Sequence, residues 1–335
     1  MITGGERIRR VLDSKPVDRT PVMASFIAAG AEWRGIPQSR IHLDADRLVS
    51  TLLGISSELG LDGAYISSDN WIIHAAIGGE VEFVHDDEPR SRQRILNDWT
   101  DFHRLKVPEP ERAERMSFML AAARQAVAQN KSHLFLEANI DSGPFQMAGI
   151  LRGAEQLMLD LVTEPAQVHT LLEFCTEVAC AYGKAMARTG VDGIQFGDST
   201  ASLIGREMYD EFVKPYQARV IAAIREAGAY PFLHVCGNSN HLSEQLGESG
   251  AACVEIDGPA DLARTMTVFA DRAAIRGNVP TTMIRAGTAD KVFERAQECL
   301  QIAKGKRFIL SPGCGVPRGS PQENIRALVR AAAEG

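Results

Sequence analysis

The chain contains a succession of short apolar runs, each followed by a longer stretch with helical periodicity. This alternation is the sequence pattern of βα units. Strands this apolar are typical of a parallel sheet that is buried on both faces, and eight of them can close into a barrel. The pattern therefore predicts an α/β fold, a (β/α)8 TIM barrel, with its eight strands beginning at Pro21, Gly63, His133, Gly193, Tyr230, Ala252, Ala273 and Arg307.

An open doubly wound sheet is the alternative. It would more naturally carry a glycine-rich phosphate loop after its first strand, and no GxGxxG occurs in the chain. Two additions to a minimal barrel are expected. A helical extension precedes Pro21, and residues 70–131 form an insertion between the second and third strands, with a hairpin or loop covering one edge of the barrel mouth. No linker interrupts the pattern, so residues 1–335 are expected to form a single domain.

Composition narrows the function classes. The 335 residues are 45% hydrophobic and carry a net charge of -7, which argues against a nucleic-acid partner, because phosphate binding requires a concentrated basic face. No apolar run approaches the roughly 20 residues that span a bilayer, and the first residues lack a signal peptide's apolar core. We therefore expect a cytoplasmic protein with no membrane partner. Its six cysteines are better explained as thiols or metal ligands than as a disulfide framework.

Polar residues gather where the predicted strands end. Active sites of barrels are built from the C-terminal ends of the strands and the loops that follow them. Such positions are therefore of interest for substrate binding and catalysis: Asn139, Asp141, Asp198, Ser199, His234, Cys236, Glu255, Asp257, Asn278 and Cys314.

Three of these residues could hold a metal ion. His234 and Cys236 are two apart on one strand, so their side chains share a face, and Cys314 lies at the end of the last strand between two glycines. One imidazole and two thiolates match a catalytic zinc site with an open fourth position, although iron and cobalt also accept such ligands. The alternatives are a core histidine with two small buried cysteines, or a disulfide between Cys236 and Cys314.

Two carboxylates are candidates for catalysis. Asp198 could orient the substrate or carry a proton, or it could cap the following helix. Glu255 and Asp257 alternate with apolar residues on the sixth predicted strand, so either could contact the metal or its surroundings, or form a salt bridge to a neighbouring strand. Asn139, Asp198, Ser199 and Asn278 are candidates for substrate binding. The remaining cysteines, Cys175, Cys180, Cys253 and Cys299, are interpreted as structural.

Several segments resemble the uroporphyrinogen decarboxylase superfamily. They are ERIRRVLDSKPVDRTPV, FGDSTASLIGREMYDEFVKPY, HVCGNS, IDGPADLARTM, IRGNVPTTMIRAGT and FILSPGCGVPRGSPQENIRAL. Within the superfamily, His234, Cys236 and Cys314 look like the zinc ligands of methylcobamide:coenzyme M methyltransferases and related corrinoid-dependent enzymes. The resemblance implies a barrel fold. It also implies zinc-dependent transfer of a methyl group from a methylated corrinoid protein to a thiol such as coenzyme M or to another acceptor, such as homocysteine or tetrahydrofolate.

The resemblance implies a protein partner as well. The chain has no DxHxxG motif for corrinoid binding, so the cobalamin-type cofactor would arrive on a separate corrinoid protein. Uroporphyrinogen decarboxylases carry a Met-Arg-Gln-Ala-Gly-Arg loop after the first strand, whereas this chain reads ASFIAAGAEWRGI, in which Arg34 is the single arginine. Decarboxylation is therefore the alternative function, and a catalytically idle barrel that serves as a binding component is a third.

Overall fold

The structure is a computed structural model that describes residues 2–91 and 94–335. Its centre is a curled sheet of seven strands, in which each strand is parallel to its neighbours and the spatial order follows the chain. The strands are β1 (Gly63–Ile66), β2 (Phe135–Ser142), β3 (Gly193–Gly197), β4 (Tyr230–Val235), β5 (Cys253–Ile256), β6 (Ala274–Val279) and β7 (Phe308–Pro312). Each lies in a run that the sequence predicts to be a strand.

The first predicted strand along the chain, which begins at Pro21, is not a strand in the structure. It is reduced to an isolated parallel bridge between Val22 and Leu310. The N–H of Met23 donates to the carbonyl of Leu310 at 3.0 Å, and the N–H of Asp62 donates to the carbonyl of Val22 at 2.9 Å. Pro21 has no N–H to extend this pairing. The prediction of parallel βα units is confirmed for seven strands, and the predicted eight-stranded barrel is corrected to a seven-stranded curled sheet.

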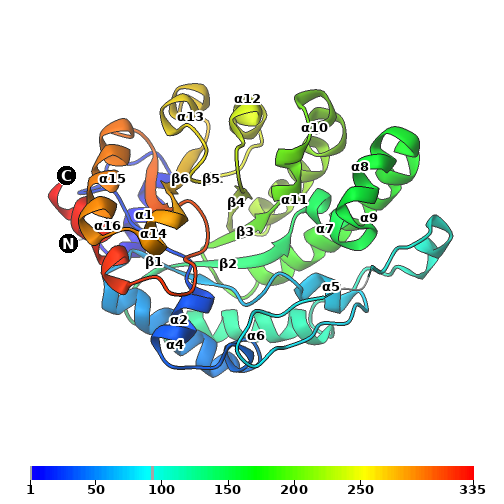
Figure 1. The fold of residues 1–335 in the computed structure, drawn as a ribbon, viewed down its shortest axis with the longest axis horizontal. Helices are drawn as coiled ribbons and strands as arrows, with labels where there is room; N and C mark the ends of the chain where they lie inside the picture. Colours follow the sequence, from blue (N-terminus) through cyan, green and yellow to red (C-terminus); the bar gives the residue numbers. More distant parts are fainter. Residues whose placement is uncertain (1, 92–93) are drawn as a thin grey trace.

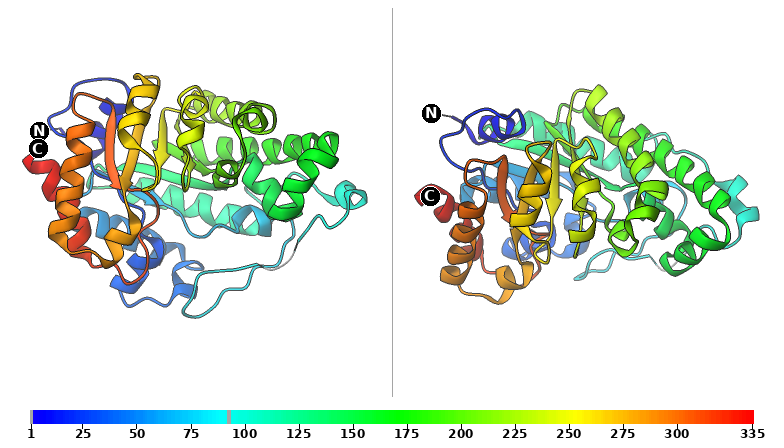
Figure 2. Two further views of the ribbon diagram at one scale, coloured as in Figure 1. Left: turned by 45° about the horizontal axis from the view of Figure 1, so that its top comes forward. Right: turned by 90° about the horizontal axis from the view of Figure 1, so that it is seen from above.

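Helices lie outside the curled sheet, and the views in Figures 1 and 2 agree on this arrangement. Between the strands the chain forms amphipathic helices whose apolar faces pack on the sheet. In the first half they are α1 (Gly4–Leu12), α2 (Ile27–Trp33), α3 (Gln38–Ile41), α4 (Ala45–Leu59), α5 (Ile72–Ala76), η1 (Trp99–Arg104), α6 (Glu114–Gln129), α7 (Pro144–Arg152), α8 (Ala154–Thr163) and α9 (Pro165–Ala187). In the second half they are η2 (Ser199–Leu203), α10 (Arg206–Phe212), α11 (Lys214–Glu226), η3 (Asn240–Leu242), α12 (Ser243–Gly247), α13 (Leu262–Phe269), α14 (Thr281–Ala286), α15 (Ala289–Ile302) and α16 (Gln322–Glu334).

The predicted helical extension is α1, and it covers the N-terminal end of the sheet. Thr3 caps this helix, since its Oγ1 accepts from the N–H of Glu6 at 3.2 Å. Ile8, Val11 and Leu12 on one face of α1 pack against the first residues of the strands, including Phe135. The N-terminal end of the sheet is therefore closed by an apolar cluster, which leaves the opposite end for a site.

The long stretch between β1 and β2 contains α5, an antiparallel bridge between Glu82 and Arg90, η1 and the crossover helix α6. The bridge forms a hairpin-like excursion whose residues Glu88 and Pro89 line the pocket described below. That this stretch is an insertion remains a prediction. Over residues 2–91 and 94–335, no helix combines the length and the hydropathy needed to cross a bilayer.

Candidate metal centre at the C-terminal end of the sheet

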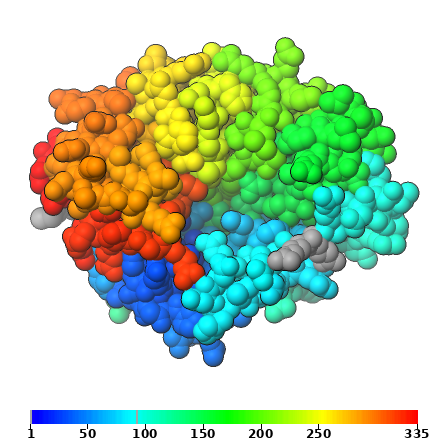
Figure 3. All heavy atoms as spheres, in the orientation of Figure 1, coloured from blue at the N-terminus to red at the C-terminus, as the bar shows by residue number. Residues whose placement is uncertain are grey.

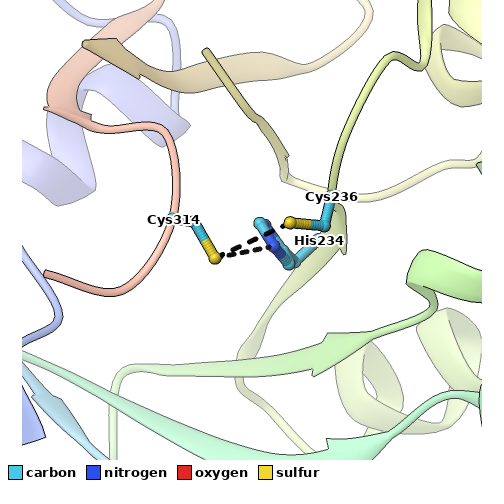
Figure 4. Close-up of side chains that lie close together, drawn as sticks. All are labelled: His234, Cys236 and Cys314. Carbon is cyan, nitrogen blue, oxygen red and sulfur yellow. Dashed lines mark hydrogen bonds between the residues drawn. The ribbon is translucent and has the colours of Figure 1, made fainter. Parts of the chain in front are cut away.

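Three side chains that could bind a metal meet at the C-terminal end of the sheet. His234 lies near the end of β4, Cys236 follows that strand, and Cys314 lies in the loop after β7. The Sγ atom of Cys314 is 3.7 Å from the Sγ atom of Cys236 and 3.8 Å from the Nε2 atom of His234. Figure 4 shows the three side chains directed toward one another. The loop after β7 therefore brings Cys314 to the two residues of β4.

The loop that carries Cys314 packs tightly on its neighbour. A Cβ atom on Gly313 would lie 2.4 Å from the backbone nitrogen of Gly258 and 2.8 Å from an oxygen of Asp257. A glycine is needed here because a side chain would push the loop that carries Cys314 away from the loop after β5.

The donor set fits a zinc ion. All three donor atoms lie within 4.8 Å of one another. Tetrahedral zinc with bonds of about 2.3 Å to sulfur and 2.0 Å to nitrogen separates its ligand atoms by roughly 3.5–3.8 Å, and the two distances above match this separation. A disulfide would need a sulfur–sulfur distance of about 2.05 Å. The two cysteines are free thiols, so the alternative of a disulfide is not supported.

Protonation in the trio is divided unevenly. Burial alone would lower the pKa of His234, but hydrogen bonds to Cys314 and Glu255 raise it to about 10. The hydrogen bond from Cys236, with the imidazole of His234, lowers the pKa of Cys314 to about 4 against the effect of burial. The pKa of Cys236 is raised by its hydrogen bond to Cys314 and by burial. One sulfur is thus already an anion at neutral pH, which is the form that binds metals.

A buried ion network lies directly behind His234. The Nδ1 atom of His234 is 3.4 Å from Oε2 of Glu255, the residue paired with it across β4 and β5. Arg276 on β6 contacts Glu255 at 2.7 Å and also forms a short ion pair with Glu137 on β2. Gln195 on β3 donates to Glu255 at 3.2 Å. With Nδ1 facing a carboxylate, Nε2 is left to face the sulfurs, which is the usual arrangement around a metal-binding histidine.

The two carboxylates of this network ionise differently. Burial raises the pKa of Glu137 well above its usual range. Burial also opposes ionisation of Glu255, but Arg276 and His234 overcome it and lower its pKa to about 2. Glu255 is therefore the carboxylate that carries the negative charge beside His234.

The three metal-binding candidates open into a pocket of about 580 Å³ at the C-terminal end of the sheet. Its walls come from the loops after the strands and from the stretch between β1 and β2. In the space-filling view, segments from the N-terminal part, the middle and the C-terminal end of the chain meet around a hollow on this face (Figure 3).

Two of the residues predicted to bind substrate line this pocket, Asn139 and Ser199. Asn139 forms a short hydrogen bond with Gln195, and its side-chain oxygen accepts from the N–H of Asp141 at 2.6 Å. The hydroxyl of Ser199 accepts from the N–H of Cys236 at 3.2 Å. Ser199 therefore also holds the loop that carries a candidate ligand.

Two other predicted residues, Asp198 and Asn278, lie behind the pocket wall. Asp198 is fully buried and accepts from the N–H of Gln146 at 2.6 Å and from the side chain of Gln217 at 2.9 Å. Burial raises its pKa to about 6. It therefore binds the first turn of α7, and its side chain makes no capping bond to the η2 helix that follows it. Asn278 is also buried and donates to the carbonyl of Ala260 at 2.8 Å.

Asp257 touches the candidate centre directly. Its Oδ2 atom accepts from the Sγ of Cys236 at 3.2 Å and from the N–H of Gly237 at 3.0 Å, and Oδ1 accepts from the N–H of Gly258. Asp257 thus joins the loop after β4 to the loop after β5.

The sequence does not single out Arg276, Glu137 or Gln195 as site residues. For Glu255 it leaves open a contact with the metal or its surroundings and a salt bridge to a neighbouring strand, and in the structure Glu255 pairs with Arg276 and faces His234. Each of the four is a polar residue buried in a strand. Gln195, Glu255 and Arg276 interrupt apolar runs, whereas Glu137 shares β2 with other polar residues. A polar residue within a predicted strand was the signal in the sequence for a paired or functional group, because burying a charged side chain is costly unless the charge is paired. Which strand supplies each partner follows from the register of the sheet and is not visible in the sequence.

Comparison with known proteins agrees with the resemblance seen in the sequence. Residues 3–335 match the family described as uroporphyrinogen decarboxylase (URO-D). A methylcobamide:CoM methyltransferase of Methanosarcina acetivorans is 28% identical, over 98% of this chain and 97% of that protein. A uroporphyrinogen decarboxylase of Anaeromyxobacter dehalogenans is 27% identical, over 95% of both chains. The solved structure of a methyltransferase from Methanosarcina mazei superposes with a TM-score of 0.91 over 100% of this chain and 99% of that one, at 22% identity, which shows a shared fold.

Proposed function

This chain belongs to the uroporphyrinogen decarboxylase family, and we propose that within it the protein is a zinc-dependent methyltransferase acting between a methylated corrinoid protein and a thiol. The observation that carries the proposal is the meeting of His234, Cys236 and Cys314. Their donor atoms lie within 4.8 Å of one another, and two of the separations, 3.7 and 3.8 Å, are close to those between ligands of tetrahedral zinc. Three protein ligands leave a fourth position for the acceptor, and the pocket gives access to it. The similarity to a methylcobamide:CoM methyltransferase supports methyl transfer from a methylated corrinoid.

A bound zinc ion would act as a Lewis acid that lowers the pKa of an incoming thiol. The protein's own residues prepare that position. Glu255 holds the imidazole of His234 with Nε2 toward the sulfurs, and Cys314 is already ionised at neutral pH. Asp257, which accepts the hydrogen bond from Cys236, is placed to take the proton of that thiol when it becomes a ligand.

The transfer itself is a substitution at carbon. The sulfur of the acceptor attacks the methyl group of the methylated corrinoid, so a carbon–sulfur bond forms while the carbon–cobalt bond breaks. The electron pair of the broken bond remains with the corrinoid, which is thereby reduced by two electrons. The proton of the thiol leaves before the attack.

The other predicted residues have positioning roles in this proposal. Asn139 and Ser199 line the pocket and would contact the acceptor. Asp198 holds α7, and Gln146 on that helix accepts from the N–H of Ser199 at 2.8 Å. Asn278 holds the carbonyl of Ala260 in the loop after β5. We further propose that residues 1–335 act as one domain and that the corrinoid protein docks at the pocket mouth.

The decarboxylase alternative is less well supported by this chain's residues. Its substrate would bring several carboxylates, which require cationic partners. Arg34, the single arginine of the segment where decarboxylases carry their arginine loop, is paired with Glu58 at 2.5 Å and does not line the pocket.

Metal analysis combined with methyl transfer tests the proposal. Purified protein loaded with zinc is expected to hold about one ion per chain and to methylate a thiol with methylcobalamin as donor. Cys314→Ser is expected to lose the ion and to lower the transfer rate by about a thousandfold or more, because one ligand and its charge are removed.

Cys180→Ser is the matched control, since Cys180 is a free thiol on α9 outside the pocket. It should leave both measurements unchanged. Full zinc occupancy in Cys314→Ser would overturn the assignment of ligands. Conversion of uroporphyrinogen to coproporphyrinogen without methyl transfer would favour the decarboxylase, and corrinoid-protein binding with neither activity would favour the idle barrel.

A further inference from the structure

We propose that the acceptor is a thiol whose non-reacting end carries a hydroxyl or ammonium group, and not a sulfonate or carboxylate. The inference rests on the proposed function and adds the chemical class of the substrate. It is drawn from the charges around the pocket of about 580 Å³, where cations are already paired and carboxylates are in excess. A short anionic thiol such as 2-mercaptoethanesulfonate, which is coenzyme M, would find no free cationic partner for its charge among the described residues that line the pocket.

The pocket wall offers one permanently charged cation within the part of the chain that the structure describes, Arg276. Its guanidinium is held between Glu137 and Glu255, and its side chain is 7% exposed. The ion pair with Glu255 also fixes the carboxylate that faces His234. Releasing Arg276 to bind a substrate anion would leave a buried carboxylate unpaired, which is strongly unfavourable.

A second arginine lies behind the wall and is also occupied. Arg115 pairs with Asp69 at 2.5 Å and donates to the carbonyl of His42 at 2.9 Å. Its guanidinium lies 5.0 Å from the ring centre of Phe83 and 4.8 Å from that of Phe118. These contacts hold Arg115 away from the cavity, and the pair with Asp69 is balanced in charge.

The imidazole of His42 supplies no positive charge either. It lines the pocket and is 2% exposed. Burial is the largest effect on it and lowers its pKa to about 4, so the ring is neutral at physiological pH.

Two lining carboxylates are left without a cationic partner. Glu88 is exposed at the rim, and no ion pair to it is found among the residues that the structure describes. Asp141 is buried and accepts hydrogen bonds from the N–H of Ile73 and the hydroxyl of Ser142. Burial raises the pKa of Asp141 to about 7, so it is partly ionised at neutral pH. The zinc site, with two thiolates around a divalent ion, would add no net charge.

The rest of the lining suits an uncharged or positively charged group. Ser67, Asn70, Asn139 and Gln195 present hydroxyl and amide groups. A hydroxyl can exchange hydrogen bonds with these groups, and an ammonium can pair with Glu88 or Asp141. A sulfonate would lose its hydration on entering a pocket that is itself negatively charged. No described side chain offsets this unfavourable free energy of desolvation and repulsion.

The test compares three thiols that differ only at one end: 2-mercaptoethanol, cysteamine and 2-mercaptoethanesulfonate. With zinc-loaded protein and methylcobalamin, kcat/KM for the first two is expected to exceed that for the sulfonate by about tenfold or more, the size of one unfavourable charge contact in a partly screened pocket. Titration calorimetry without donor should rank the three dissociation constants in the same order. This binding measurement is independent of methyl transfer.

Glu88→Gln provides a second test, in which the ratio of kcat/KM for cysteamine to kcat/KM for the sulfonate is compared between the variant and the unchanged protein. The different acidities of the thiols affect both proteins equally and so cancel. The substitution should lower the preference for cysteamine over the sulfonate by roughly threefold, because one rim charge is removed. Glu226→Gln, an exposed glutamate at the end of α11, is the matched control and should leave the ratio unchanged.

Equal or tighter binding of the sulfonate, or failure of all three thiols to bind, would overturn the inference. Ordered binding without methyl transfer would instead support the inference about the pocket and contradict the proposed function. The two failures are therefore distinguishable.

Discussion

The two ends of the curled sheet use their side chains for different purposes. At the N-terminal end, α1 lays Ile8 and Leu12 against Phe135, and the cluster is apolar throughout. At the C-terminal end, His234 and Glu255 occupy the sheet interior with other polar side chains around a pocket. The two ends of one sheet can therefore serve different roles. Burial of apolar side chains at the N-terminal end provides stability, while the C-terminal end carries buried polar groups that a purely structural protein would avoid.

The two ends also differ in whether their carboxylates have cationic partners. At the N-terminal end Arg7 binds Asp18 through two hydrogen bonds of 2.6 and 2.7 Å and also pairs with Asp62 at 2.5 Å. The carboxylates there have cationic partners. At the C-terminal end Asp141 has no cationic partner among the residues that the structure describes, and burial raises its pKa, so its ionisation opposes folding.

Phe135→Ala should test the stabilising role of the N-terminal end. Phe135 is fully buried and its ring centre lies 5.8 Å from that of Phe232. Its truncation should lower the free energy of unfolding by about 3–5 kcal/mol, as measured by urea denaturation. Zinc bound per folded chain should not change. Loss of zinc from protein that is still folded would show that the two ends are not separate.

Glu255→Gln should lower the affinity of the C-terminal end for zinc without a loss of stability comparable to that of Phe135→Ala. Removing the charge beside Nδ1 of His234 should lower zinc affinity by about 10- to 100-fold, measured by competition with a chelator. The matched control is Glu137→Gln, which alters the other carboxylate on Arg276 but leaves the one facing His234. If both variants lower the affinity equally, Glu255 does not act through His234.

Asp141→Asn should reveal the cost of the unpaired carboxylate. Because the pKa of Asp141 is about 7 in the folded state and lower in the unfolded state, the folded state holds the extra proton, and stability falls as pH rises through this range. Between pH 6 and pH 8 the variant should gain about 1 kcal/mol relative to the unchanged protein. Asp290→Asn, at an exposed position, is the control and should show no such slope. Parallel pH curves for all three proteins would contradict the prediction.

Asp18→Asn should show the opposite sign at the N-terminal end. The hydrogen bonds from Arg7 lower the pKa of Asp18 to about 2, so its contribution to stability is complete above the ordinary pKa and disappears as pH falls toward 2. Since Asp18 is 44% exposed, solvent screening limits the loss in the variant to about 1 kcal/mol or less at pH 6. The difference in unfolding free energy should shrink between pH 4 and pH 2. A difference that grows in this range would contradict the assignment.

Much of the fold was predictable because parallel strands leave a strong apolar signal. The segment at Pro21 was overpredicted for a physical reason: an apolar run shows that residues are buried, but not that they have backbone partners for a full strand. Pro21 lacks a donor, and the segment pairs through only a few backbone hydrogen bonds.

The candidate site was predictable in part. The two-residue spacing places His234 and Cys236 on one face, but only the folded loop after β7 brings Cys314 within 3.8 Å of His234. Asp198 and Asn278 sit at strand ends, as predicted, yet they turn toward backbone groups behind the pocket. Sequence does not reveal which face of a strand end a side chain takes, because the strand's regular alternation stops there.

The distance along the chain between the two cysteines has a consequence for biosynthesis. Cys314 is 78 residues beyond Cys236, so a nascent chain presents only two of the three candidate metal ligands until β7 has docked beside β6. A growing polypeptide on the ribosome would hold cations weakly through two donors, whereas the finished protein would offer all three. Strong metal binding would thus become possible only once the fold is complete.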